Sequence, residues 1–210
     1  MAKERIILAS GSPRRRELLA GMGVAFEVVT AEVRELRAED SPGLSPAELA
    51  RENARRKGEE VAALRPGRWV LGADTVVAQE RRAHRRAGGG SEGRSVESRV
   101  FGKPPSLEQA RQYLQMLSGE THEVITGCAL ISPAGGLELF HEVSRVTFRF
   151  LTEETIGRYL AEVNVLDKAG AYALQERGEW IVEQVEGSRT NVIGLPTEAL
   201  ERVLLGHGLL

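Results

Sequence analysis

Short apolar runs alternate along the chain with segments whose apolar residues recur at the helical spacing of three and four. The first run is "RIILA" at residues 5–9, and an alternating stretch, "AFEVVT", covers residues 25–30. Between them, "PRRRELLAGMG" places its apolar residues on one side of a helix that begins at Pro13. The pattern therefore predicts a strand, a loop, a helix and a second strand.

Capping signals mark the later helices. The stretch "SPAELARENARRKGEEVAAL" begins with Ser45 as N-cap, a proline at the first helical position and Glu48 to complete a capping box. "SLEQARQYLQML" repeats the signal with Ser106 and Gln109. The same reasoning predicts two further helices, at residues 152–163 and 197–206.

The longer apolar runs read as strands. "RWVLGADTVVAQ" predicts a buried strand interrupted by a turn residue, and "THEVITGCALIS" and "GLELFHEVSRVTFRFL" predict a hairpin joined through "PAGG". Two short strands are expected at residues 171–175 and 179–187. Because helices and strands are interleaved throughout, the fold class is α/β, with a mixed sheet and flanking helices.

Residues 80–99 differ from the rest of the chain. This segment, "ERRAHRRAGGGSEGRSVESR", is rich in arginine and glycine and has almost no apolar residue, so we expect a mobile, disordered insertion in a hairpin. A nucleic-acid-binding arm is the alternative, which the absence of interleaved aromatic residues disfavours. The length of 210 residues favours one domain over residues 1–210.

Composition adds little to this outline, but it argues against some classes of protein. Lysine and arginine number 28 against 30 acidic residues, which gives no global reason to bind a polyanion. The one cysteine, Cys128, excludes an internal disulfide and lies in the apolar "GCALIS", where a buried hydrophobe is expected. With no membrane-length apolar run and no signal-peptide pattern, the sequence predicts a cytoplasmic protein without a membrane partner.

The first loop has the character of an anion site. A strand that leads through "SGS" into a helix at Pro13 directs backbone N–H groups and the positive end of the helix dipole to one place. Arg14 and Arg15 lie in the first turn, where cations oppose the dipole, and a bound phosphate would offset that cost. Arg16, one step further round, is expected to be solvated.

Two charged residues occupy positions that should be apolar. Lys57 fills a place in the apolar stripe of its helix, so its side chain either points inward or extends out to solvent. Asp74 lies between "WVLGA" and "TVVA", where it either forms an Asx turn or faces a metal, a water or the lysines. Glu32 or Glu35 could supply a second carboxylate to a Mg²⁺ site.

Three further residues are candidates by type. Lys103 in "FGKPPS" lies just before a helix N-terminus and is either another cation at the anion site or an ordinary surface lysine. His122 could be a general base, although a lone histidine that opens a strand is more often structural. Gln175 in "ALQERG" could read a base edge with its amide, or be a polar residue at a strand end.

Several long motifs together resemble one family. "LASGSPRRRELL", "LGADTVV", "GKPPSLEQARQYLQMLSGETHEVITG" and "DKAGAYALQERG", with "GLP" near the end, are similar in order and spacing to the Maf family of nucleoside-triphosphate pyrophosphatases. The resemblance implies an α/β fold like that of the inosine-triphosphate pyrophosphatases, with two lobes around a cleft. It also implies a divalent cation (Mg²⁺, or Mn²⁺ or Co²⁺), release of pyrophosphate and a homodimer.

The resemblance also implies roles for individual residues. It places the family's phosphate-binding positions on Ser10, Arg15, Lys57 and Lys103, and its acidic, metal-binding positions on Glu35 and Asp74, with Asp74 as the base that activates water. The branch that acts on dTTP and UTP is indicated at Arg14, Thr75 and Gln175.

Other functions stay open at this point. One is a non-catalytic regulator of cell division that binds a nucleotide or a nucleic acid, with the arginine-rich segment as its contact. Another is a pyrophosphatase that prefers 7-methyl-GTP or other modified purine triphosphates.

Overall fold

A seven-stranded mixed sheet organises the chain in this computed structural model, which describes residues 4–82 and 96–210. The strand order is β2-β1-β3-β5-β6-β7, with β4 paired to β3, and β1 is parallel to β2 and β3 while all other pairs are antiparallel. The strands are β1 (Ile6–Leu8), β2 (Phe26–Val28), β3 (Val70–Arg82), β4 (Val96–Phe101), β5 (Thr121–Ile131), β6 (Leu137–Phe148) and β7 (Val182–Glu186). The predicted α/β class with a mixed sheet and flanking helices is confirmed.

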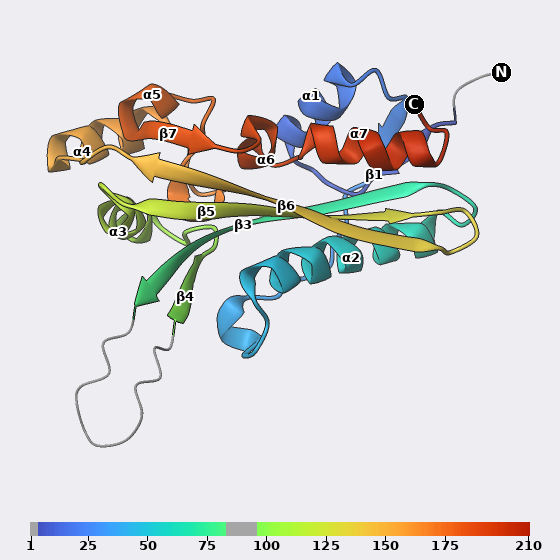
Figure 1. Cartoon of the computed structure of the whole chain (residues 1–210), viewed down its shortest axis with the longest axis horizontal. Helices are drawn as coiled ribbons and strands as arrows, with labels where there is room; N and C mark the ends of the chain where they lie inside the picture. The colour runs from blue at the N-terminus through green and yellow to red at the C-terminus, as the bar shows by residue number, and fades with distance from the viewer. Residues whose placement is uncertain (1–3, 83–95) are drawn as a thin grey trace.

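Helices cover both faces of this sheet, with α2 on one side and α1, α6 and α7 on the other (Figure 1). The helices are α1 (Pro13–Gly21), α2 (Pro46–Leu64), α3 (Leu107–Leu117), α4 (Glu153–Glu162), α5 (Gly178–Ile181), α6 (Arg189–Ile193) and α7 (Thr197–Gly206), with 3₁₀ turns at η1 (Ala38–Asp40) and η2 (Ala169–Ala171). The reciprocal capping box of Ser45 and Glu48 is present at the start of α2. No helix among the described residues is long and apolar enough to cross a membrane.

The long helix α2 lies unusually close to β3 and β5. A Cβ atom on Gly72 would lie 2.2 Å from the carbonyl oxygen of Ala54, and one on Gly127 would lie 2.4 Å from the carbonyl carbon of Ala50. Only glycine permits this backbone approach. The close contact carries the inner face of α2, including the buried Lys57, directly onto the sheet.

The opposite face of the sheet carries two separate hydrophobic clusters. Leu71 and Ala73 of β3 belong to the cluster under α1 and α7, whereas Val77 belongs to the cluster under α3 and α4. Thr75 lies between them on the same face and pairs across the ladder with Thr126 of β5. The two lobes implied by the resemblance are thus two clusters on one continuous sheet, and polar residues separate them.

The sequence pattern misassigned the chain between α4 and α7. The predicted strand at residues 171–175 is the end of η2 and a loop, because Ala171 has a φ of 61°, which a strand does not adopt. The predicted strand at 179–187 begins as helix α5 and becomes β7 only at Val182. Helix α6 was not predicted, although Ser188 at its N-cap and Gly194 at its C-cap are residues typical of helix ends.

The hairpin around the arginine-rich segment is longer than expected. Strands β3 and β4 pair from Val77↔Phe101 to Arg82↔Val96, so residues 80–82 and 96–99 of the predicted insertion belong to a hydrogen-bonded ladder. The rest of that segment, residues 83–95, lies outside the described residues. At α3 only half of the predicted capping box forms, because the Gln109 side chain bonds to Gln112 instead of to the backbone of Ser106.

Candidate active site

A cleft opens where β3 has no neighbour on one side. Within the described strands, β1 pairs with β3 only at Val70 and Leu71, and β4 pairs with it only from Val77 onward. Of the residues between these two pairings, Asp74 and Thr75 line a cleft of about 390 Å³. All nine predicted site residues line this cleft: Ser10, Arg14, Arg15, Glu35, Lys57, Asp74, Thr75, Lys103 and Gln175.

The charged end of the cleft is built around Lys57. Its Nζ donates to Asp74 Oδ1 at 2.6 Å and to Glu35 Oε1 at 2.6 Å. Lys103 Nζ donates to both oxygens of Glu35, at 3.0 and 3.2 Å. Lys57 is 9% exposed and Asp74 6%, so the inward interpretation of Lys57 is confirmed. Because β3 runs unbroken through Asp74, the expected turn residue and the Asx turn are wrong.

These contacts set the ionisation of Glu35. Burial alone would raise the pKa of this carboxyl group, but the ammonium groups of Lys57 and Lys103 outweigh it and lower the pKa to about 2. Glu35 is therefore an anion at neutral pH. Glu32 does not line the cleft, and its backbone N–H donates to Glu60, so Glu35 is the acidic loop residue that reaches the site.

Asn53 fastens the loop that carries Glu35 to α2. Its Oδ1 accepts from the backbone N–H of Leu36 at 2.7 Å, and its Nδ2 donates to the Leu36 carbonyl at 3.0 Å and to Asp74 Oδ2 at 3.3 Å. Sequence reasoning missed this residue. The available signal was an amide at a buried position of the same helical face as Lys57.

The donor set fits a divalent cation held partly by substrate. Glu35 and Asp74 each place a carboxylate oxygen 2.6 Å from the Lys57 ammonium, so the two oxygens lie close together. Carboxylate oxygens are ligands that Mg²⁺ prefers. Within residues 4–82 and 96–210, no group of three or more His, Cys, Asp or Glu side chains could hold a metal ion alone. An ion bound here would complete its coordination with phosphate oxygens and water.

Arg15 is largely committed to the protein itself. Its Nε donates to the Gly194 carbonyl at 2.8 Å, and its Nη1 donates to Ser10 Oγ at 3.1 Å and to the Ala73 carbonyl at 2.9 Å. Its Nη2 donates to Thr75 Oγ1 at 3.0 Å. Of the five guanidinium N–H groups, one is left for a ligand. Burial lowers the pKa of Arg15, and four protein acceptors compensate for that burial.

The opposite wall is a loop that ends in Gln175. Arg14 reaches across the cleft from α1, and its Nη1 lies 3.3 Å from Asp167 Oδ2. Lys168, only 5% exposed, contacts Asp167 Oδ1 at 2.9 Å, Glu176 Oε1 at 3.3 Å and the Asn164 carbonyl. Asp167 and Lys168 belong to the "DKAG" motif, but the sequence alone predicted no role for either residue.

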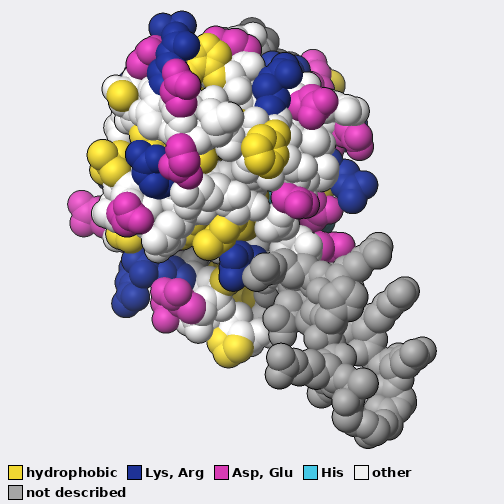
Figure 2. Space-filling model, turned by 90° about the vertical axis from the view of Figure 1, so that its left-hand side faces the viewer, with side chains coloured by type: hydrophobic (Ala, Val, Ile, Leu, Met, Phe, Trp, Pro, Cys, Tyr) yellow, Lys and Arg dark blue, Asp and Glu magenta, His cyan; other side chains and the backbone are white. Residues whose placement is uncertain are grey.

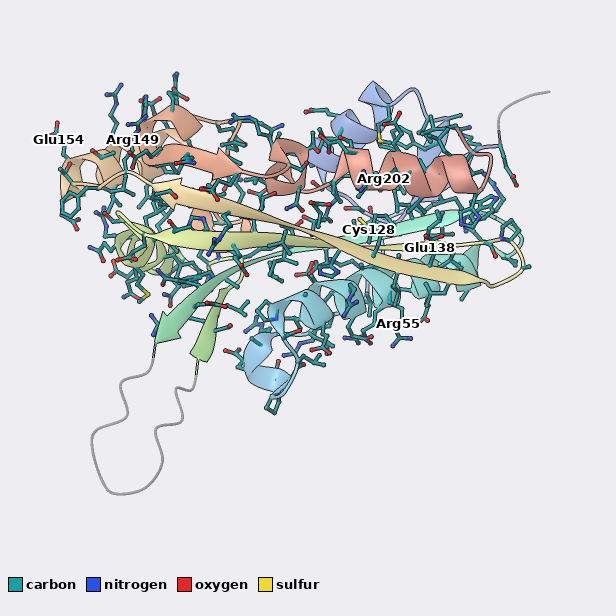
Figure 3. All side chains as sticks on the ribbon, in the orientation of Figure 1. Arg55, Cys128, Glu138, Arg149, Glu154 and Arg202 are labelled. Carbon is teal, nitrogen blue, oxygen red and sulfur yellow. The ribbon has the colours of Figure 1, made fainter. Side chains whose placement is uncertain are left out.

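Three other candidates lie outside the site. His122 is buried, its Nε2 lies 2.9 Å from the Tyr172 hydroxyl, and burial lowers the pKa of its imidazole to about 3, so the structural interpretation is confirmed. Cys128 lies inside the molecule (Figure 3), where burial raises its thiol pKa to about 12. Arg16 is exposed, as expected.

This fold and this site define a mixed α/β protein whose cleft brings cationic side chains together with the carboxylates of Glu35 and Asp74. The sequence matches the family described as "Maf-like protein" over residues 5–207, and the chain belongs to that family. It is 41% identical to the "dTTP/UTP pyrophosphatase" of Nitratidesulfovibrio vulgaris, with 99% of this chain and 90% of the relative covered. It is 42% identical to the protein of the same name from Bacillus cereus, with 96% and 89% covered.

The solved structures that the chain matches share less of its sequence than these relatives do. The chain is similar to a HAM1 protein from Coxiella burnetii, with 14% identity, a TM-score of 0.49, and coverage of 97% of this chain and 99% of that one.

Proposed function

We propose that this protein hydrolyses nucleoside triphosphates, with dTTP and UTP preferred, to the monophosphate and pyrophosphate in the cytoplasm. The observation that carries the proposal is the buried ammonium of Lys57, held at 2.6 Å from both Asp74 and Glu35 in a cleft that also contains Lys103 and Arg14. Relatives at 41–42% identity carry the name dTTP/UTP pyrophosphatase.

The cationic side chains hold the triphosphate. Phosphoryl transfer depends mostly on positioning and on stabilisation of charge, which Lys57, Lys103 and the remaining N–H of Arg15 supply. Asp74 and Glu35 would hold a divalent cation, Mg²⁺ or alternatively Mn²⁺ or Co²⁺, which when bound neutralises phosphate charge and polarises the phosphoryl oxygens.

Asp74 accepts the proton in the hydrolytic step. Lys57 holds its Oδ1, whereas among the described residues Oδ2 has only the 3.3 Å contact with Asn53, and Oδ2 is the oxygen able to take a proton. The water oxygen forms a bond to the α-phosphorus while its proton passes to Asp74. The bond from the α-phosphorus to the bridging oxygen breaks, and pyrophosphate leaves with the electron pair beside the lysines.

The base is proposed to lie at the other end of the cleft. Arg14, Thr75 and Gln175 line the cleft, as do the apolar Val77, Val124 and Val192, which belong to or pack against one hydrophobic cluster. This arrangement suits an aromatic ring with polar groups at its edge. The preference for a pyrimidine triphosphate over 7-methyl-GTP rests on the relatives named dTTP/UTP pyrophosphatase.

A binding protein without turnover is the competing function. Figure 2 shows, outside its grey region, cationic and anionic side chains interspersed on the end of the molecule that carries α3, α4 and α5, which disfavours that face as a nucleic-acid surface. The homodimer implied by the resemblance stays a prediction, testable by light scattering.

The decisive assay is pyrophosphate release from dTTP, UTP, CTP, ATP, GTP and 7-methyl-GTP with Mg²⁺, Mn²⁺ or Co²⁺. We expect dTTP and UTP to be cleaved fastest and Asp74→Asn to be inactive but folded. Asp40→Asn, in the exposed turn η1, controls for loss of a carboxylate. If no triphosphate is cleaved with any of these metals, the proposal is wrong and the binding function becomes the better one.

A further inference from the structure

Hydrogen-bond directions in the Thr75–Thr126 pair can be assigned from the acceptors alone. Thr126 Oγ1 lies 3.0 Å from the backbone carbonyl oxygen of Asn191, which can only accept, so the Thr126 hydroxyl proton is used there. The 2.9 Å contact between Thr75 Oγ1 and Thr126 Oγ1 must then be a donation from Thr75. Thr75 therefore has no proton left to offer to a ligand.

The remaining capacity of Thr75 is that of an acceptor. Its oxygen already accepts from Arg15 Nη2 at 3.0 Å, which leaves one lone pair at a residue that lines the cleft. Gly194 has no side chain to cover this oxygen, whereas a Cβ at that position would lie 3.6 Å from it. A ligand group that meets Thr75 must be a hydrogen-bond donor.

Buried contacts keep the Asn191 carbonyl in place. The Asn191 side chain is fully buried, and its Nδ2 donates to the Val124 carbonyl and to Ser144 Oγ, both at 2.9 Å. Its Oδ1 accepts from the backbone N–H of Thr126 at 3.2 Å. Neither Thr126 nor Asn191 lines the cleft. The direction of the Thr126 hydroxyl is thus set by groups that a ligand does not touch.

The same accounting gives Ser10 the opposite polarity. Ser10 Oγ accepts from Arg15 Nη1 at 3.1 Å and from the backbone N–H of Ser12 at 3.3 Å, which occupies both lone pairs. Its proton is the group left for a ligand, and a phosphate oxygen is a matching acceptor. The protein thereby presents a donor at Ser10 and an acceptor at Thr75.

We propose that Thr126 is a positioning residue that selects the base by fixing Thr75 as an acceptor. Uracil and thymine carry a ring N3–H donor, whereas N3 of cytosine is an acceptor and would meet the Thr75 lone pair without a proton between them. An unmatched buried polar pair is costly, which is the basis of strong discrimination. This inference rests on the proposed pyrimidine nucleotide function.

The test measures affinity by calorimetry for the α,β-imido analogues of UTP and CTP, which resist cleavage. In Thr126→Val the Thr75 proton is released and can turn toward cytosine N3, so we expect the UTP-to-CTP affinity ratio to fall about tenfold, the scale of one hydrogen bond. Thr126→Ser restores the hydroxyl and should restore the ratio.

A matched control exists on the same strand. Thr121 of β5 forms a similar cross-strand pair with Thr147, at 2.9 Å between the hydroxyl oxygens and outside the cleft. Thr121→Val should therefore leave the ratio unchanged. If Thr126→Val does not fold, Thr75→Val removes the acceptor itself and should abolish the preference for UTP.

The outcomes separate this inference from the proposed function. If the wild-type protein binds both analogues equally or binds neither, or if Thr126→Val keeps the wild-type ratio while folded, the inference is overturned. Pyrophosphate release from UTP, assayed in parallel, decides the proposed function independently of that ratio.

Discussion

Lys57 is the residue on which the charged end of the cleft depends. Removing its ammonium would leave Asp74 and Glu35 facing one another with no cation between them, and such a loss is more costly than the absence of a surface ion pair. Within the described part of the chain, the Lys103 ammonium pairs with Glu35 alone, and its side chain is half exposed, so it cannot take over both contacts.

We expect Lys57→Met to lower kcat for UTP by about 100-fold or more, the scale of losing one preorganised charge. Steady-state kinetics together with a melting curve would check this. Arg55→Met is a matched control, because Arg55 lies on the outer side of the same helix (Figure 3), where it pairs with Glu52 and Glu59. Equal activity of the two variants would remove Lys57 from the mechanism.

His122 predicts an acid-sensitive fold. The unfolded chain binds a proton at this imidazole below about pH 6.5, whereas the folded protein, with a pKa of about 3, does not. Stability should therefore fall as the pH drops from 6.5 toward 3. Denaturant unfolding would measure the free energy of unfolding of the wild type and of His122→Gln. Between pH 6.5 and 3, that free energy should fall more for the wild type than for the variant.

His141→Gln, on the exposed part of β6, controls for the substitution. A pH-independent difference between wild type and His122→Gln would contradict the prediction.

At the scale of elements, the contact between α2 and the sheet positions the chemistry. Gly127→Ala would force a methyl group to within 2.4 Å of the backbone at Ala50, so the helix must move away and take Asn53 and Lys57 with it. We expect a loss of about 3 kcal/mol in unfolding free energy, the upper range for overpacking, together with reduced activity. Gly21→Ala, with open space at its Cβ, should keep both.

How far the sequence predicts this site depends on the kind of residue. Lys57 and Asp74 could be found because a charge at an apolar position is costly wherever the chain folds. The partners of Arg15 could not, because the carbonyls of Ala73 and Gly194 carry no sequence signal and only the topology brings them together. The strand expected at residues 171–175 failed because Ala171 takes a positive φ.

At the scale of the molecule, the described β3–β4 ladder predicts that the arginine-rich segment is dispensable for hydrolysis. The last described pair of that ladder is Arg82↔Val96. Replacing residues 84–94 with Asn-Gly, a favoured hairpin turn, should therefore preserve the ladder and the rate of pyrophosphate release. Loss of a nucleic-acid ligand on replacement, with no hydrolysis in either protein, would instead favour the binding function.

The stretch of β3 that has a neighbour on one side only, β5, also makes the two proposed roles depend on whether a residue is at an odd or an even position. Asp74 and Thr75 are consecutive, so the pleat sends one toward Lys57 and the other toward Arg15. Inserting one residue just before them would exchange the two directions, presenting a hydroxyl to Lys57 and a carboxylate to the proposed base site. The number of residues in this stretch is therefore constrained as tightly as the identities of Gly72, Asp74 and Thr75, and a single-residue insertion or deletion here should abolish activity.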